Sequence, residues 1–285
     1  MISKGINYFC NFVQNKKYML KFISLGSGSS GNCYFLYTET DGLLIDAGVG
    51  VRSVKRCLKK YGIPLNRVKH MIITHDHADH VKAVGSVSRD FNLPVYSTLT
   101  VHVGINNNYC VRCKVDPARV RIFEKGDTIT LGSFTVTSFA VPHDSLDSVG
   151  YRIQVGDIVF CIMTDVGHLT DEMKKYISET NYLIIEANYD LEMLKAGTYP
   201  EYLKARILSE NGHMSNTECG TALAENITEN LKHAWLCHLS EENNHPELAR
   251  KTVEQILRSY GIIAGKDFQL DVLKRTTPSE VFELT

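Results

Sequence analysis

The sequence predicts an α/β fold, and three observations support that prediction. Short apolar runs of strand length alternate with segments in which apolar residues recur at helical spacing. These elements follow one another in two successive halves, without an internal repeat or a low-complexity linker. The composition, 44% hydrophobic and 22% charged over 285 residues, is that of a globular protein that can bury a full core.

The first half is expected to hold five strands and two helices. The strands are predicted over residues 20–25, 33–38, 42–46, 71–74 and 95–97, and the helices over 51–61 and about 81–91. Gly62 is the expected stop of the first helix.

The second half is expected to continue the alternation. Strands are predicted over 128–141 around the Gly132 turn, 149–155, 157–164, 183–185 and 234–237, with a last one within 267–273. Helices are predicted at about 170–179 and 246–260. Another helix should start at Ser215-Asn216-Thr217-Glu218, which has the pattern of a capping box.

Residues 1–18 are predicted to be a leader, either disordered or a mis-called start, and residues 19–285 a single domain. Asn7, Asn11 and Asn15 interrupt any signal-peptide core, and Met19 opens a clean strand. No apolar stretch approaches the roughly 18–20 residues of a membrane span, so no membrane partner is expected. The net charge of −1 gives no global basic field, so a nucleic acid would have to be held by a local patch.

The eight cysteines show no repeated spacing apart from Cys110-x-x-Cys113. This usage favours free thiols in a reducing compartment, and hence a cytoplasmic location, over a disulfide framework. For Cys110 and Cys113, structural or incidental thiols are favoured over a metal or redox role.

The most informative motif is His75-Asp76-His77-Ala78-Asp79-His80, directly after the apolar run 71–74. Imidazole and carboxylate together suit Zn, Mn or Fe. A strand that ends and turns here would aim His75 and His77 at one ion and Asp79 and His80 at a second.

This motif resembles the metal motif of the metallo-β-lactamase superfamily, and the resemblance runs from about residue 19 to the end. It implies an αββα sandwich, in which two mixed β-sheets pack face to face with helices outside. It implies two divalent metal ions, Zn or Mn with Fe as an option, and a metal-bridged hydroxide as nucleophile. The implied ligands are His75, His77 and His143 for the first ion, Asp79, His80 and His238 for the second, and Asp165 for both. Asp76 is expected to orient an imidazole rather than to bind metal.

Three further segments resemble one branch of that superfamily. Glu186, His213 and His238 occur in the order of ribonuclease Z-like phosphodiesterases, which implies that His213 is the proton donor and Glu186 its orienter. The chain also resembles the YycJ/WalJ group of bacterial metallohydrolases in segments 25–32, 186–190, 199–200, 206–207 and 212–216. That resemblance implies a 5′ to 3′ DNA exonuclease.

The predicted function is therefore a dinuclear metal-dependent hydrolase that acts as a nuclease on single-stranded DNA or DNA ends. Small-molecule ester, thioester or cyclic phosphodiester hydrolysis is the alternative, and a non-enzymatic metal-binding module the third reading. The protein is expected to be a monomer or homodimer.

Candidate substrate-binding residues are Ser27, Ser29, Ser30, Asn32, Arg206, Ser215 and Asn216. The Gly/Ser loop over 26–32 is either a phosphate cradle or a tight turn. Basic residues 112–121 are read as a solvated face.

Overall fold

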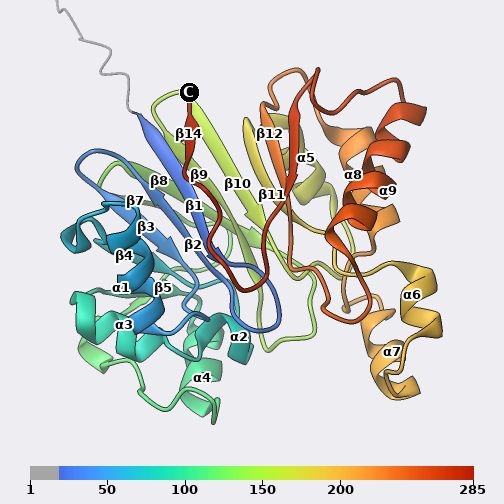
Figure 1. Ribbon diagram of the computed structural model, residues 1–285. Helices are drawn as coiled ribbons and strands as arrows, with labels where there is room; N and C mark the ends of the chain where they lie inside the picture. Colours follow the sequence, from blue (N-terminus) through green and yellow to red (C-terminus); the bar gives the residue numbers. More distant parts are fainter. Residues whose placement is uncertain (1–18) are drawn as a thin grey trace, which may run out of the picture.

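Two seven-stranded mixed sheets pack face to face in the computed structural model, which describes residues 19–285 (Figure 1). The first sheet has the order β14 (Phe282–Leu284), β1 (Leu20–Gly26), β2 (Cys33–Tyr37), β3 (Gly42–Ile45), β4 (His70–Ile72), β5 (Val95–Ser97) and β6 (Val120–Ile122). The second has the order β13 (Gln269–Val272), β12 (His233–Cys237), β11 (Tyr182–Glu186), β10 (Ile158–Met163), β9 (Val149–Val155), β8 (Phe134–Ala140) and β7 (Thr128–Leu131). The predicted leader, residues 1–18, lies outside the described residues.

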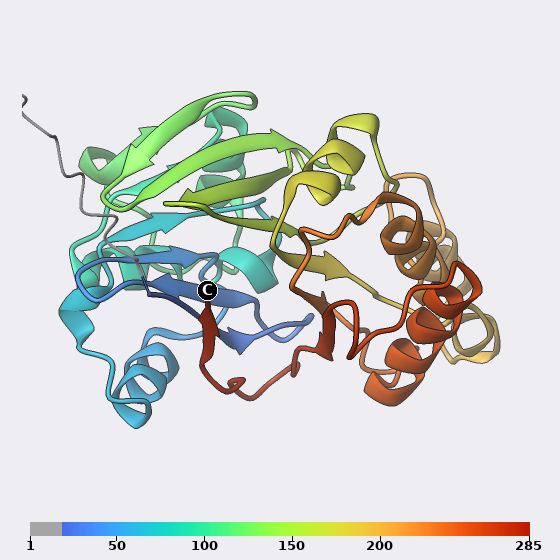
Figure 2. The same ribbon diagram turned by 90° about the horizontal axis from the view of Figure 1, so that it is seen from above.

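Helices cover the outer face of each sheet, so the layers are those of the predicted αββα sandwich. The first sheet is covered by α1 (Val51–Lys60), α3 (Val84–Phe91) and α4 (Leu99–Asn107). The second is covered by α5 (Asp171–Glu179), α8 (Asn216–Asn226) and α9 (Pro246–Ser259). The helices of the two halves therefore lie on opposite sides of the molecule (Figure 2).

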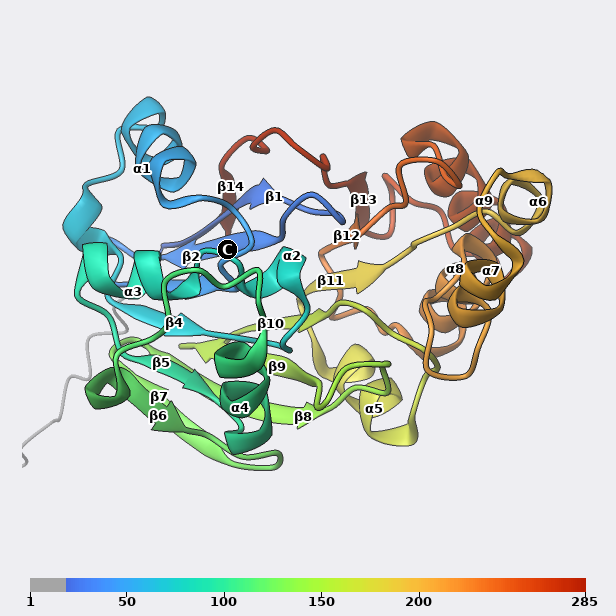
Figure 3. The same ribbon diagram turned by 90° about the horizontal axis from the view of Figure 1, so that it is seen from below.

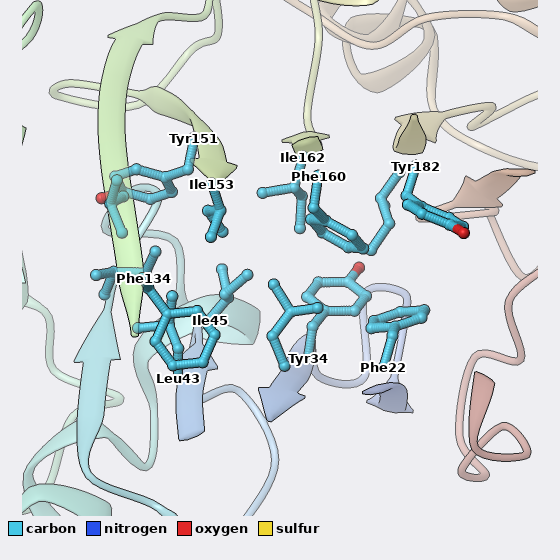
Figure 4. Packing of buried hydrophobic residues seen from close by; sticks show 14 of the residues in the cluster. Phe22, Tyr34, Leu43, Ile45, Phe134, Tyr151, Ile153, Phe160, Ile162 and Tyr182 are labelled. Carbon is cyan, nitrogen blue, oxygen red and sulfur yellow. The ribbon is translucent and has the colours of Figure 1, made fainter. Parts of the chain in front are cut away.

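The main core lies between the sheets, where aromatic and branched side chains of both inner faces meet (Figure 4). Along β2, Tyr34 and Leu36 face the opposite sheet, whereas Cys33 and Phe35 face the helices. A strand that is buried on both faces needs a continuous apolar run, which is why these strands read as unbroken hydrophobic segments.

The predicted helix at 81–91 is wrong in its extent, because two helices stand there. The first is α2 (Ala78–Val81), which begins inside the His-rich motif, and α3 starts only at Val84. At the break, the amide N–H of Ala83 donates to the carbonyl of Ala47 (2.9 Å) instead of continuing the helix. This contact fixes α2 against the end of β3.

Several elements were not predicted from the sequence. These are α4, β6, β14, and the pair α6 (Leu191–Ala196) and α7 (Glu201–Ile207) between β11 and α8. The α4 segment is rich in β-branched residues, glycine and asparagine, which conceals a helix. The predicted last strand is β13, but β14 follows it and pairs antiparallel with β1 in the other sheet. That pairing joins residues more than 250 positions apart, and no local pattern encodes it.

Candidate active site

The site lies along one edge of the sandwich, where strands of both sheets end. β3 and β4 are parallel neighbours in the first sheet, and β10, β11 and β12 are parallel neighbours in the second. The carboxyl ends of parallel strands meet at one edge, so the residues that follow them gather there. His75, His143, Asp165, Glu186 and His238 each end or closely follow a strand. Figure 3 views these strand ends together with α2.

The backbone bends sharply at three of these strand ends. Asp46, Asp165 and His238 have φ values of 61°, 55° and 54°, in the left-handed region that L-residues rarely adopt. Such a conformation costs about 1–3 kcal/mol and persists where the surrounding structure imposes it. This backbone conformation directs the side chains of Asp46, Asp165 and His238 toward the same cluster of histidines and aspartates.

A first group of possible metal ligands consists of His75, His77 and His143, whose ligand atoms lie within 4.8 Å of one another. Burial lowers the pKa of both His75 and His143, so these imidazoles are neutral at physiological pH and have a lone pair to offer. Nε2 of His75 is buried without a hydrogen-bond partner among the described residues. Nε2 of His143 lies 3.2 Å from Nδ1 of His77. A cation between these nitrogens would satisfy them.

A second group consists of Asp79, His80 and His238. Nε2 of His238 lies 3.1 Å from Oδ2 of Asp79. Burial opposes protonation of His80, but the carboxylates of Asp165, Asp79 and Asp46 outweigh it and raise the pKa of His80 to about 10. The negative charge of these carboxylates can be neutralised by a divalent cation as well as by a proton on His80.

Asp165 belongs with both groups. Its Oδ2 lies 3.1 Å from Nε2 of His80, and its Oδ1 lies 3.6 Å from Nε2 of His143. Burial opposes ionisation, but the imidazoles of His238, His80 and His75 hold the pKa of Asp165 well below its usual range. A permanently ionised carboxylate between two sets of imidazoles is suited to bridge two cations.

In two of these imidazoles, Nδ1 is held by an acceptor behind the ring. Nδ1–H of His143 donates to the Gly212 carbonyl (3.0 Å), and Nδ1–H of His80 donates to Oδ2 of Asp46 (2.7 Å). Such bonds orient the ring and direct Nε2 toward the cluster, where a metal would lie. Together with the unpartnered nitrogen of His75, they show that the residues present fit divalent metal ions.

Asp46 was missed by the sequence analysis, although it is the last residue of the third predicted strand. Its carboxylate accepts from the Thr74 amide (2.8 Å) and from the Thr74 hydroxyl (2.9 Å), besides His80. Asp76 was expected to orient an imidazole, but its carboxylate accepts from the amide of Leu146 (3.3 Å) instead. For His80, the orienting contact comes from Asp46.

Glu186 and His213 form the predicted pair. Nδ1–H of His213 donates to Oε1 of Glu186 at 2.7 Å. Burial opposes ionisation of Glu186, but the charge and the hydrogen bonds of His213 and the bond from His238 lower its pKa to about 2. Burial likewise opposes protonation of His213, and Glu186 and Asp165 outweigh it and raise the pKa of His213. The protonated form of the His213 imidazole is therefore favoured, and its Nε2 is left free of the carboxylate.

Glu186 is surrounded by hydrogen-bond donors. Besides His213, Oε1 accepts from His238 (3.0 Å) and Asn188 (3.2 Å), while Oε2 accepts from the amides of Val166 (2.7 Å) and Met214 (3.1 Å). Both oxygens are occupied by these donors, which favours a positioning role for Glu186, although its ligand atom also lies within 4.8 Å of those of Asp165, His213 and His238 in a further group that could hold a metal ion.

The candidate substrate-binding residues are divided by the structure. The side chain of Asn32 lies against the second group, with its Nδ2 3.0 Å from Asp79 and 2.8 Å from Nε2 of His80. Ser29 and Ser30 are exposed on the Gly/Ser loop. Arg206 pairs with Asp144 (3.0 Å), whose carboxylate lies 3.4 Å from Nε2 of His143.

The remaining candidates are engaged in the fold. Ser215 forms the predicted capping box of α8 with Glu218. Asn216 is buried and exchanges two side-chain hydrogen bonds with Asn244 (3.0 and 2.8 Å). Ser27 is fully buried, and its hydroxyl contacts the Tyr34 hydroxyl (2.9 Å) and accepts from the amide of His238 (3.1 Å). These three polar groups are already paired within the protein.

We expect Ser27→Ala to act on stability rather than on substrate binding. The change leaves the buried amide of His238 without its acceptor, which should destabilise the fold by about 1–3 kcal/mol. The exposed Ser29→Ala is the control and should change stability by less than about 0.5 kcal/mol. Urea unfolding of both variants measures this. If Ser27→Ala instead kept its stability but bound a phosphate-containing ligand more weakly, a phosphate cradle would be supported.

No helix among residues 19–285 is both long and apolar enough to cross a membrane. The seven cysteines in this part of the chain are all free thiols, and Cys110 and Cys113 are partly exposed.

Known proteins resemble this chain along most of its length. A model of the β-lactamase superfamily domain matches residues 42–238. The exodeoxyribonuclease YycJ of Bacillus anthracis is 34% identical over 262 residues, which cover 92% of this chain and 98% of that protein. The exodeoxyribonuclease WalJ of Streptococcus pneumoniae is 35% identical over 250 residues, which cover 88% and 93%.

Solved structures agree on the fold. The metallo-β-lactamase fold protein YhfI of Bacillus subtilis matches with a TM-score of 0.69 at 18% identity, covering 93% of this chain and all of that one. The short form of human tRNase Z matches with a TM-score of 0.58 at 16% identity, covering 91% and 98%. The predicted αββα sandwich and the predicted class, a metal-dependent hydrolase, are confirmed. The chain therefore belongs to the β-lactamase superfamily and, within it, to the family of the YycJ and WalJ proteins.

Proposed function

We propose that this protein is a DNA exonuclease that cleaves phosphodiester bonds of single-stranded DNA or DNA ends in the 5′ to 3′ direction. The observation that carries the proposal is the Glu186–His213 pair beside the clustered histidines and aspartates. Hydrolysis of a phosphodiester needs a proton for the departing oxygen, and the imidazole of His213, whose protonated form Glu186 favours, can supply it. The names of the YycJ and WalJ relatives point to DNA as the polymer.

In this proposal the site holds two divalent metal ions, Zn or Mn, with Fe as a third option. The residues that would hold them are His75, His77 and His143 for one ion, Asp79, His80 and His238 for the other, and Asp165 for both. When bound, such ions lower the pKa of a water toward neutrality and offset the negative charge of the phosphate.

The protein's own residues supply the proton. Glu186 holds Nδ1 of His213, which fixes the ring and favours its protonated form. His213 then donates the proton at Nε2 to the oxygen that leaves, and Glu186 keeps the imidazolium oriented throughout.

The pH profile should depend on Glu186. His213 must be protonated to donate, so kcat is expected to fall as pH rises through its pKa, which lies above the ordinary value. Glu186→Gln removes the charge that raises this pKa, so the alkaline limit of kcat should move to lower pH. The kcat–pH profiles of the wild type and the variant measure this. Metal content is the control, because Glu186 also contacts His238.

The proposed function is tested by cleavage of 5′-labelled single- and double-stranded DNA by protein reconstituted with Zn or Mn. Asp165→Ala and His213→Ala are the controls. Degradation that is lost in both variants supports the nuclease. If DNA stays intact while bis-p-nitrophenyl phosphate or a thioester is hydrolysed, the substrate is a small molecule instead.

We propose that residues 19–285 form a single domain and that the protein works in the cytoplasm. The free cysteines support a reducing compartment, because exported proteins commonly pair theirs.

A further inference from the structure

Two adjoining hollows lie beside the Gly/Ser loop, outside the candidate metal ligands. They enclose about 480 and about 460 Å³ and share Gly50, Ser53 and Lys82 in their walls. Their lining contains cations but no acidic side chain. The cations are Arg52, Arg56, Lys60, Lys82, Arg112 and Arg275. We refer to this surface, defined by these six cations, as the basic hollow.

The charge of the basic hollow is not balanced by the protein. None of the six cations forms an ion pair within residues 19–285, although the whole chain has a net charge of −1. By contrast Lys55, on the same helix α1, pairs with Asp90 (2.7 Å). A cluster of unpaired cations in a concave surface attracts an anion that the protein does not itself supply.

The helix α1 places like charges together at a cost to its own stability. Arg52, Arg56 and Lys60 are four residues apart and lie on one exposed face. Like charges at this spacing destabilise a helix by about 0.2–0.5 kcal/mol per pair. The first turn of α1 also contains no acidic residue and no side-chain cap. This arrangement of charges does not stabilise the helix, which favours a role in binding an anion.

The basic hollow adjoins the candidate metal site across a single loop. Nζ of Lys82 donates to the carbonyl of Ser30 on the outer side of the Gly/Ser loop (2.5 Å). On the inner side of that loop, the amide of Asn32 donates to the carbonyl of Asp79 (2.7 Å). Arg275 reaches the other flank, where its Nη1 donates to the carbonyl of Ser240, two residues after His238 (3.0 Å). A chain of phosphates that leaves the metal site over this loop would enter the basic hollow.

We propose that the basic hollow binds the phosphodiester backbone of the DNA strand on one side of the bond that is cleaved. The inference rests on the proposed nuclease function and adds the path of its substrate. Cations without acidic neighbours recognise phosphates, and the lining contains no aromatic side chain on which a base would stack. Binding here is therefore independent of base sequence and depends on strand length and on salt.

The test removes the three cations of α1 in the variant Arg52→Gln/Arg56→Gln/Lys60→Gln. Its matched control, Lys251→Gln/Arg258→Gln/Lys266→Gln, removes three positive charges from exposed positions on α9 and the turn after it, on the opposite side of the molecule (Figure 3). A charge-conserving variant, Arg52→Lys/Arg56→Lys/Lys60→Arg, separates charge from helix structure. Each holoenzyme is assayed on single-stranded DNA of 2 to 20 nucleotides at several salt concentrations and on bis-p-nitrophenyl phosphate.

The neutralised variant should bind long DNA weakly and keep its chemistry. For single strands each phosphate contact contributes about 0.7 to the slope of log affinity against log salt, so three lost contacts lower that slope by about 2. At 0.1 M salt this corresponds to a KM about 100-fold higher for the 20-mer. The KM for a dinucleotide and the turnover of bis-p-nitrophenyl phosphate should not change. The control and the charge-conserving variant should behave like the wild type.

Three results would overturn the inference. In the first, the neutralised variant keeps the wild-type KM and salt slope on the 20-mer. In the second, the KM of the α9 control rises as much as that of the neutralised variant. In the third, the KM of the charge-conserving variant rises as much. The first of these leaves the nuclease function standing. If the wild type does not cleave DNA at all, the nuclease proposal falls. DNA binding is then measured by fluorescence anisotropy with a labelled 20-mer. Binding that is weakened only in the neutralised variant would support the basic hollow as a DNA-binding surface, and absence of binding to the wild type would refute it.

Discussion

The His213→Ala variant is expected to lose a factor of about 10²–10⁴ in kcat on DNA and to keep its metal ions. His213 is held through Nδ1 by Glu186, so its part is to donate a proton at Nε2. Loss of the proton donor should lower kcat most for substrates whose departing oxygen is strongly basic, as in DNA. Bis-p-nitrophenyl phosphate releases p-nitrophenolate, which leaves without protonation, so its hydrolysis should fall far less.

His233 provides a matched control for this experiment. It begins β12, at the end of the strand opposite to His238. His233 also pairs with a carboxylate, Asp271 (2.9 Å), but lies outside the metal cluster. His233→Ala should therefore leave kcat on DNA unchanged. His213 would be a metal ligand instead of a proton donor if elemental analysis of His213→Ala found one ion fewer and both substrates lost activity equally.

The sequence identified most of this site because its signals are local. The His-rich motif packs four of the candidate ligands into six residues, and α2 and the preceding strand keep them together. His143, Asp165 and His238 each follow a strand that is easily recognised, and parallel strands bring such ends to a common edge. The same logic applied to Asp46, but nothing local distinguished its carboxylate from an ordinary acidic residue at a turn.

Features that join distant parts of the chain were not predictable. The basic hollow combines α1, the junction of α2 and α3, and residues near 112 and 275, so its cations are scattered along the sequence. Arg112 was read as part of a solvated face. Ser27 was predicted as a candidate phosphate ligand because it lies in a Gly/Ser loop, and the fold adds a contact that the sequence does not reveal, since its hydroxyl accepts from the amide of His238.

The Asp165→Asn variant is expected to have the broadest effect, because Asp165 is the carboxylate shared by both groups of candidate ligands. Asparagine keeps the shape of the side chain and tolerates the φ of 55°, whereas alanine would add backbone strain. Removal of the charge leaves the imidazoles of His80 and His238 without the anion between them. The variant should therefore bind at most one metal ion per chain.

Activity should fall by at least about 10³-fold on DNA and on bis-p-nitrophenyl phosphate alike, equivalent to about 4 kcal/mol of transition-state stabilisation. This uniform loss distinguishes Asp165 from His213, whose removal should spare the activated substrate. Elemental analysis gives the metal content, and assays of both substrates at saturating Zn or Mn give the activity. Two ions per chain with full activity in Asp165→Asn would rule out a bridging role, and the ions would then have to be held by the two histidine groups separately.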